Sequence, residues 1–168
     1  ISELVVTTIA RQLDVEMNVR IASRTTANLS SYAHTLKGYW QFRKLTPQST
    51  IEARHSFEQA IAHDPANAEA IAWLAITHCE EWIQDFNEVY AITGAALAAK
   101  ATALDPMNAT CRSIETWALL CVGNREAALL CSEKGMALNP SDPAVQVNRA
   151  LTLGYDGRCG EAVELMAQ

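Results

Sequence analysis

Three consecutive residues with metal-binding side chains are the first candidates for chemistry in this sequence. His78, Cys79 and Glu80 stand together in an Ala-rich stretch, and imidazole, thiolate and carboxylate groups are the usual ligands of zinc. Adjacent residues of a helix point about 100° apart, however, so three in a row cannot share one ion with good geometry. We therefore expect no metal site here and assign these residues to structural or surface roles.

The remaining histidines and cysteines do not match metal-site spacings either. His55 and His63 lie about two turns apart on one helix, whereas a helical metal site uses ligands one turn apart. Cys111, Cys121 and Cys131 are spaced by tens, and this spacing matches no zinc pattern. Because cysteine is among the most buried residue types, we interpret Cys121 and Cys131 as small core residues.

No constellation for catalysis or cofactor binding is visible. The sequence contains no Ser-His-Asp set, no paired carboxylates at a suitable spacing and no glycine-rich phosphate loop. Gly157 and Gly160 surround Arg158-Cys159, and we interpret this segment as a turn between helices. We expect no catalytic, cofactor-binding or metal-binding residues and predict that this fragment is not an enzyme.

Composition favours a helical protein that binds neither nucleic acid nor membrane. Hydrophobic residues make up 49% of the 168 residues, while aromatic residues make up only 7%. This excess of small apolar residues favours close helix–helix contact over a bulky sheet core. The net charge is −6 and no stretch gathers Lys and Arg, whereas nucleic-acid-binding proteins carry a basic stripe.

Cysteine usage and the ends of the chain bear on its location. The five cysteines are odd in number and form no CxxC pair, so reduced thiols and a cytoplasmic location are expected. No apolar run reaches the ~18–20 residues of a spanning helix. The sequence starts at Ile1 without a basic leader; we expect no signal peptide and interpret the chain as a fragment of a longer protein.

The pattern of apolar residues and stop signals predicts an all-α chain. Residues 1–22 carry an apolar residue at every fourth position, which predicts a helix, although residues 14–22 also alternate as in a strand. Residues 23–29 are polar and predict a linker. Ser30 or Ser31 is expected to cap the next helix, and Thr46 with Pro47 the one after it. The expected helices then cover residues 30–45, 47–63, 67–84, 88–104, 108–122, 125–138, 143–155 and 160–166.

A short sequence pattern of small residues followed by a proline recurs along the chain. It first appears with Ala53, Phe57 and Ala60 before Asp64-Pro65. The intervals from Pro65 to Pro106 and from Pro106 to Pro140 are 41 and 34 residues. Proline ends each helix because the residue before it avoids the helical region. The chain is therefore built from repeated helix–turn–helix units.

A period of 34 residues with two helices per unit resembles the tetratricopeptide repeat (TPR) family. The resemblance implies a right-handed superhelical solenoid of antiparallel helix pairs, with small residues where the helices of a pair cross. We expect about four units over residues 30–168, the last one incomplete, preceded by a lead-in helix and linker over residues 1–29. The second unit has seven extra residues near 81–87, and Gly135, Ala98 and Ser132 depart from the consensus. The expected crossing residues are Ala75, Gly94, Ala128, Ala150 and Ala162.

A second set of residues bears on the parent protein. These residues are Ile9-Ala10-Arg11-Gln12-Leu13, Gly38-Tyr39-Trp40, Lys44-Leu45-Thr46-Pro47, Ala53, Phe57-Glu58-Gln59-Ala60, Asp64-Pro65, Ala68, Ala70, Leu74 and Ala75. Through them the sequence resembles the TPR region that follows the catalytic domain of many bacterial class III adenylate cyclases, or the winged-helix domain of some bacterial transcription regulators. This resemblance implies a non-catalytic segment of a bacterial signalling protein, whose full-length form could be a nucleotide cyclase.

In TPR solenoids the first helix of each unit lines a concave groove, so the resemblance also suggests a binding surface. The groove expected here is apolar and aromatic with a few acids, and it lacks the Lys/Asn/Arg set with which chaperone-binding TPR proteins hold a C-terminal carboxylate. The principal candidates are Glu69, Ala72, Ile76, Glu80, Ser113, Trp117, Leu120, Val147, Leu151 and Tyr155. The same register adds Cys79, Thr110, Cys121 and Ala144, and places Tyr32, Thr35, Tyr39 and Phe42 in the first unit.

Two functional hypotheses follow from this surface. The chain is either a scaffold whose groove binds a protein or peptide partner, including other domains of its parent, or a module for homodimerisation through its first and last helices. The aromatic residues Trp82, Phe86 and Tyr90 of the long second unit are expected to fasten its extended loop onto the helix pair. An exposed contact patch is the alternative for these three residues.

Overall fold

The fold was derived from a computed structural model, which describes residues 26–167. Within this range the chain contains eight α-helices and no strand, as expected for an all-α protein. None of the described helices is both long and apolar enough to cross a membrane. The expected lead-in helix over residues 1–22 lies outside the described residues. The helices are α2 (Thr26–Phe42), α3 (Pro47–His63), α4 (Ala68–Asp85), α5 (Glu88–Leu104), α6 (Ala109–Cys121), α7 (Arg125–Leu138), α8 (Pro143–Tyr155) and α9 (Cys159–Met166).

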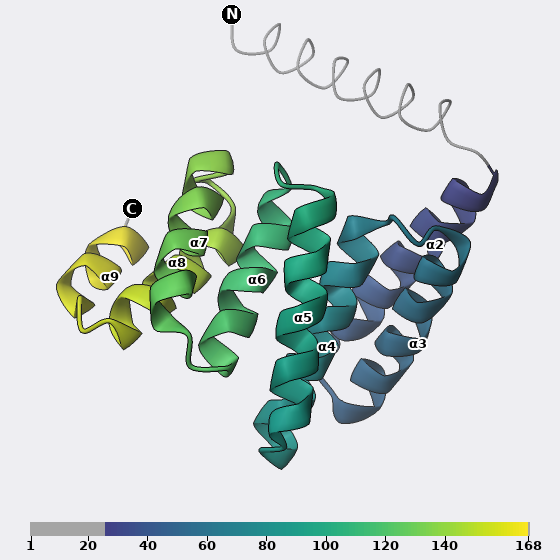
Figure 1. The fold of residues 1–168 in the computed structure, drawn as a ribbon, viewed down its shortest axis with the longest axis horizontal. Helices are drawn as coiled ribbons and strands as arrows, with labels where there is room; N and C mark the ends of the chain where they lie inside the picture. The colour runs from purple at the N-terminus through teal and green to yellow at the C-terminus, as the bar shows by residue number, and fades with distance from the viewer. Residues whose placement is uncertain (1–25, 168) are drawn as a thin grey trace, which may run out of the picture.

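The helices pack as four consecutive pairs stacked along one direction (Figure 1). Each odd-numbered helix packs against the even-numbered helix before it and, up to α7, against the one after it. The even-numbered helices also contact one another in the order α2, α4, α6, α8. These four helices form one layer, here called the inner layer, and α3, α5 and α7 form the outer layer.

Polar side chains that cap the helix starts explain why the helices begin where they do. Thr46 and Ser49 form a reciprocal capping box in front of Pro47, which confirms the expected start of α3. The side chains of Asn67, Asn108 and Asp142 accept hydrogen bonds from the first turns of their helices. The helix boundaries expected from residue 47 onward are thus confirmed to within one or two residues.

The start of α2 differs from the sequence-based expectation. Residues 26–29 are already helical, so the expected caps at Ser30 or Ser31 are wrong. Ser31 is instead buried inside the pair, where its hydroxyl donates a hydrogen bond to the Ala60 carbonyl at 2.7 Å. The Ser31 hydroxyl therefore joins α2 to α3 and does not cap a helix start.

Small residues allow the helices of each pair to approach closely. A Cβ added at Gly38 would lie 2.5 Å from the ring of Phe57, and one added at Gly94 would lie 2.9 Å from the Cys79 sulfur. Trp73 then joins the first two units, since its ring lies 5.0 Å from that of Tyr39 and 6.3 Å from that of Phe57. The core is therefore continuous from the first unit into the second.

The second unit is longer than the third because both of its helices extend towards their shared turn. Helices α4 and α5 have 18 and 17 residues, against 13 and 14 in α6 and α7. Trp82 packs against the core, and Tyr90 stacks on His78. These two residues fasten the extension as expected, whereas Phe86, in a left-handed turn conformation, is 76% exposed.

Candidate functional site

One row of larger side chains crosses the inner layer. Tyr39, Ile76, Trp117 and Leu151 come from α2, α4, α6 and α8, and all four are at least partly accessible. Each directly follows a small or short residue at the equivalent position of its helix: Gly38, Ala75, Thr116 and Ala150. Because the inner helices contact one another in order, these side chains recur once per unit along the inner layer.

Two of the principal groove candidates are covered instead of accessible, as are four of the residues that the same register adds: Thr35, Phe42, Cys79 and Cys121. Ala72 is fully buried and Ser113 is 4% exposed, so neither offers surface to a partner. Ser113 accepts two hydrogen bonds from the Asn148 amide, at 3.0 Å to its carbonyl and 2.8 Å to its hydroxyl. Small residues at this position let the next inner helix approach, and that contact closes over them.

Glu80 is the expected groove residue with the most unusual surroundings. It is partly accessible, and within the described part of the chain it has no hydrogen-bond or ion-pair partner. Burial raises the pKa of its carboxyl group above the ordinary value of 4.5. A carboxylate that lacks a partner and has lost part of its hydration is a site where a cation would be favourable.

Two buried thiols lie beside Glu80. Cys79 of α4 and Cys121 of α6 interact through their sulfur atoms, and this contact together with burial raises the pKa of Cys79. Burial also raises the pKa of Cys111 to about 12 and that of Cys131 to about 11. Cys121 and Cys131 are buried, as expected of core residues. The raised pKa of Cys131 makes its thiol a poor nucleophile at neutral pH.

The three consecutive candidates for metal binding point in different directions. Cys79 points into the core. On the other side of α4, the His78 ring stacks on Tyr90, and its Nδ1 atom lies 3.7 Å from Oε2 of Glu81. Burial and the neighbouring Arg54 lower the pKa of His78. Among residues 26–167, no three His, Cys, Asp or Glu side chains gather as metal ligands would.

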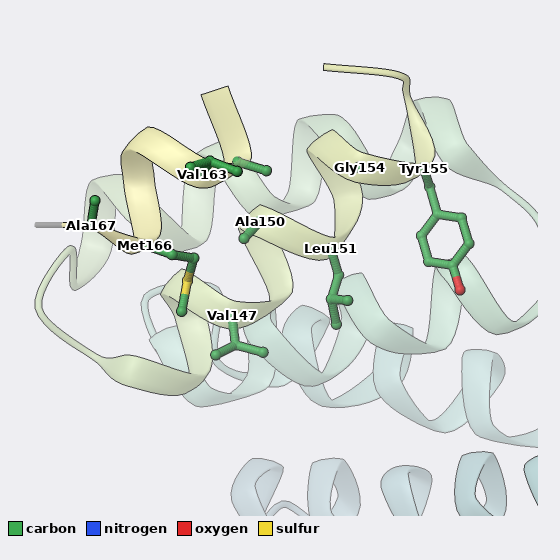
Figure 2. Close-up of a pocket in the computed structure, with 9 residues that line it drawn as sticks. Val147, Ala150, Leu151, Gly154, Tyr155, Val163, Met166 and Ala167 are labelled. Atoms are coloured by element: carbon green, nitrogen blue, oxygen red, sulfur yellow. The ribbon is translucent and has the colours of Figure 1, made fainter. Parts of the chain in front are cut away.

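The groove residues expected in the fourth unit line a cavity of about 790 Å³ between α8 and α9. Figure 2 shows Val147, Leu151 and Tyr155 pointing the same way from α8. They are 42%, 39% and 54% exposed. Helix α9 contributes Val163 and Met166 to the opposite wall. The cavity is almost entirely apolar, so it can accept aliphatic or aromatic side chains.

At the other end of the inner layer lies a smaller, polar pocket of about 240 Å³. Tyr32, Thr35 and Glu69, all expected at the groove, contribute to its wall together with Asp64 and Asn67. The Asn67 amide donates hydrogen bonds to Ser31 and Thr35, at 2.8 and 3.1 Å. The pocket is therefore acidic on one side and held by cross-helix hydrogen bonds on the other.

Sequence reasoning placed the residues of α8 in the groove but missed those of α9. Val163 and Met166 are three residues apart and face the same cavity. Their spacing could have indicated an apolar face, since residues three apart share one side of a helix. The ion pair between Arg54 of α3 and Glu81 of α4 was also missed, because nothing in the spacing of 27 residues predicts that they meet.

Comparison with known proteins relates this chain to others through structure alone. No protein-family model matches it, and no curated protein matches its sequence. A mutant O-GlcNAc transferase from Thermobaculum terrenum superposes with a TM-score of 0.65 at 18% identity, over 77% of this chain and 23% of the transferase chain. This chain thus spans about a quarter of that protein.

Smaller domains match over nearly their full length. The TPR domain of Arabidopsis OM64 superposes with a TM-score of 0.61 at 16% identity, over 77% of this chain and 98% of that domain. The first TPR domain of Spaghetti (RPAP3), bound to an HSP90 peptide, superposes with a TM-score of 0.57 at 15% identity, over 84% of this chain and 98% of that domain. At these identities the likeness shows the fold: the described residues form a TPR solenoid.

Proposed function

We propose that this chain is a non-catalytic scaffold whose inner layer binds a segment of a protein partner. Support comes from Glu80, a partly buried carboxylate that lacks a partner in the described chain and lies one turn beyond Ile76 on α4. The structures of RPAP3 domains with HSP90 and HSP70 peptides show that solenoids of this fold accommodate short peptides. A rigid stack of helices offers such a segment a preformed surface.

The chemistry of the inner layer indicates a cationic and apolar partner segment. A Lys or Arg side chain would supply a counter-ion for Glu80, and the face of Trp117 on the next inner helix would favour a guanidinium group. The apolar cavity beside Leu151 would take a large aliphatic or aromatic residue. Glu69 and Glu80 would repel an acidic segment, so the HSP90 peptide SRMEEVD is expected to bind this chain weakly.

The geometry of the stack gives an approximate spacing between these two anchors. Glu80 lies on α4 and the cavity on α8, two inner helices further along. Packed helices lie about 8–10 Å apart, which places the anchors roughly 16–20 Å from each other. An extended chain rises about 3.3 Å per residue, so the partner's cationic and apolar residues are expected about five to six positions apart.

Peptide display on the immobilised chain tests this proposal. Random peptides selected on the wild-type chain are expected to carry Lys or Arg with a large apolar residue at that spacing. A synthetic peptide from the selection should bind Glu80→Lys at least tenfold more weakly than wild type, since two like charges would meet. Leu130→Glu, which adds charge on the outer helix α7 where Leu130 is 56% exposed, is the matched control and should bind like wild type.

Two results would overturn the proposal. Selected peptides without cationic residues would contradict the role of Glu80. Equal affinity of Glu80→Lys and wild type, with unchanged circular dichroism, would place the binding site elsewhere on the solenoid. The peptide SRMEEVD serves as the acidic comparison, and tight binding of that peptide would also contradict the proposed partner class.

The narrower proposal concerns the parent protein. On the sequence resemblance alone, we propose that the chain is the regulatory TPR segment of a larger bacterial signalling protein such as an adenylate cyclase, acting in the cytoplasm. The alternatives are the TPR segment of a winged-helix transcription regulator and a dimerisation module that pairs through its first and last helices. The encoding gene decides between the parents: a cyclase domain upstream supports the first proposal, and its absence contradicts it.

A further inference from the structure

We infer that the outer face of α5 is a homodimer interface, in which α5 of one copy packs antiparallel against α5 of a second copy. The interface lies on the outer layer and uses none of the inner-layer residues. Its two-fold axis would pass close to Ala96, the central exposed residue of the helix.

Helix α5 is apolar on its exposed side as well as on its buried side. Its only charged residues are Glu88 and Lys100, at opposite ends of an uncharged run of eleven residues. Val89 and Ile92 are 64% and 61% exposed, and Ala96, Ala99 and Ala103 follow on the same exposed face. A helix that is hydrophobic all round normally has partners on all sides.

The exposed faces of the other outer helices are mixed: Ile51 of α3 and Leu130 of α7 are each 56% exposed, but charged residues share those faces. The exposed face of α3 carries Glu52, His55 and Glu58, and that of α7 carries Glu126 and Glu133. Helix α5 packs against α4 and α6, and residues 89, 92, 96, 99 and 103 on its outer face stay exposed within the described chain. The uncharged outer face is therefore specific to α5 and is not a property of the whole outer layer.

The spacing of the exposed residues fits a helix of the same sequence. Residues 89, 92, 96, 99 and 103 follow the alternating three- and four-residue steps of a coiled-coil seam. Three of the five are alanine, which allows two helix backbones to approach to about 8 Å. In an antiparallel pair centred on Ala96, the larger Val89 lies opposite Ala103, so a large side chain meets a small one at each end of the seam.

The ends of the seam support the antiparallel direction. Phe86 and Met107 are 76% and 74% exposed at the two ends of α5. An antiparallel pair brings Phe86 of one copy to Met107 of the other, and sulfur–aromatic contacts of this kind are favourable. The same arrangement places Lys100 within about one turn, ~6 Å along the axis, of Glu88 on the second copy. A parallel pair would bring like charges to the same end.

Light scattering and sedimentation of the chain test this inference. The wild-type chain is expected to have twice its monomer mass of 18.4 kDa at concentrations on the order of 100 µM. Ile92→Glu and Ala96→Glu should raise the dimer dissociation constant at least tenfold, because each places charge in the apolar seam. Leu130→Glu, an equally exposed substitution on α7, should leave the mass unchanged. Circular dichroism checks that each variant is folded.

Disulfide trapping tests the direction of the pair without relying on disruptive variants. In a Cys159→Ser background, whose other thiols are buried, a mixture of Val89→Cys and Ala103→Cys chains should form a mixed disulfide on mild oxidation. Each oxidised bond joins two thiols from different copies, and the added oxidised glutathione takes up the two electrons and two protons. Neither variant alone should cross-link efficiently.

Three outcomes would overturn the inference. A wild-type chain that stays monomeric would mean that α5 does not pair with itself. A dimer that persists in Ile92→Glu would place the interface elsewhere, for example on the first and last helices. Cross-linking of Val89→Cys with itself would show a parallel pair. Because Glu80 lies on the other layer, Glu80→Lys should leave the dimer intact, so failure of the groove proposal and failure of the dimer are distinguishable.

Discussion

At the scale of single residues, Glu80 is the clearest case of a charged side chain whose surroundings do not favour its charge. A carboxyl group in this position loses hydration without gaining a hydrogen bond or a counter-ion from the described chain. Unpaired charges of this kind lower the free energy of unfolding. Such a cost is typical of binding sites, where the missing partner is supplied by a ligand.

We predict that Glu80→Gln stabilises the folded chain at neutral pH. Burial raises the pKa of Glu80 in the folded state, so the folded chain favours the protonated carboxyl. The contribution of Glu80 to the free energy of unfolding is fully present below the pKa of Glu80 in the unfolded chain. It is lost as the pH rises through the pKa of Glu80 in the folded chain. In urea unfolding, the free energy of unfolding of Glu80→Gln should therefore exceed that of wild type at pH 7. The difference should disappear below about pH 4. A variant less stable than wild type at pH 7 would mean that Glu80 has a favourable partner.

Two glycines of the outer helices should respond in opposite ways to alanine. A Cβ at Gly94 would lie 2.9 Å from the Cys79 sulfur and 3.1 Å from the Ala75 carbonyl oxygen, whereas one at Gly135 would lie 3.5 Å from Val145. Gly94→Ala should lower the free energy of unfolding by about 1–3 kcal/mol through overpacking. Gly135→Ala should raise it by about 0.5–1 kcal/mol, because alanine has less backbone entropy to lose. Chemical denaturation measures both, and equal effects would contradict the close α4–α5 contact.

At the scale of elements, the capping side chains both start helices and join units. Asn67 accepts a hydrogen bond from Ala70 at the start of α4 while its amide donates to Ser31 and Thr35 of α2. Asn124 only caps α7, through Ala127 at its exposed start. Asn67 therefore contributes to local structure and to the contact between the first two units at the same time.

We predict that Asn67→Ala is more destabilising than Asn124→Ala. Loss of a cap alone costs about 1 kcal/mol. Asn67→Ala also removes two donors from the buried contact with Ser31 and Thr35, so a total of about 2–3 kcal/mol is expected. Asn67→Asp keeps the capping oxygen but not the donors. Its melting temperature should therefore lie between those of Asn67→Ala and Asn124→Ala. Equal losses for Asn67→Ala and Asn124→Ala would mean that the cross-helix bonds contribute nothing.

Helix boundaries were largely predictable because their signals are local. Thr46 with Pro47, Asn67 and Asp142 mark helix starts through their own backbone contacts. Ser31 misled the prediction because a hydroxyl that suits a helix start equally suits a buried contact with the Ala60 carbonyl. That choice depends on packing between helices, to which local sequence is insensitive.

At the scale of the whole molecule, the repeat period was sufficient to predict the solenoid, but not which of the candidate groove residues are accessible. Spacing alone treats Ala72 and Trp117 as equivalent groove positions. In the stack, the small side chain of Ala72 is covered by the neighbouring helix, while Trp117 remains partly accessible. Accessibility depends on how closely adjacent units approach, and this is set by long-range packing between residues of several helices.

The most direct test of the inner-layer groove is the response of the tryptophan side chains to a bound peptide. The chain has four tryptophans, and their indole N–H groups give separate NMR signals. Titration with a peptide selected on the wild-type chain should shift the indole signal of Trp117, on the inner layer, and leave that of Trp82, in the α4–α5 extension, unchanged. A shift of Trp82 with no change at Trp117 would contradict the proposed groove.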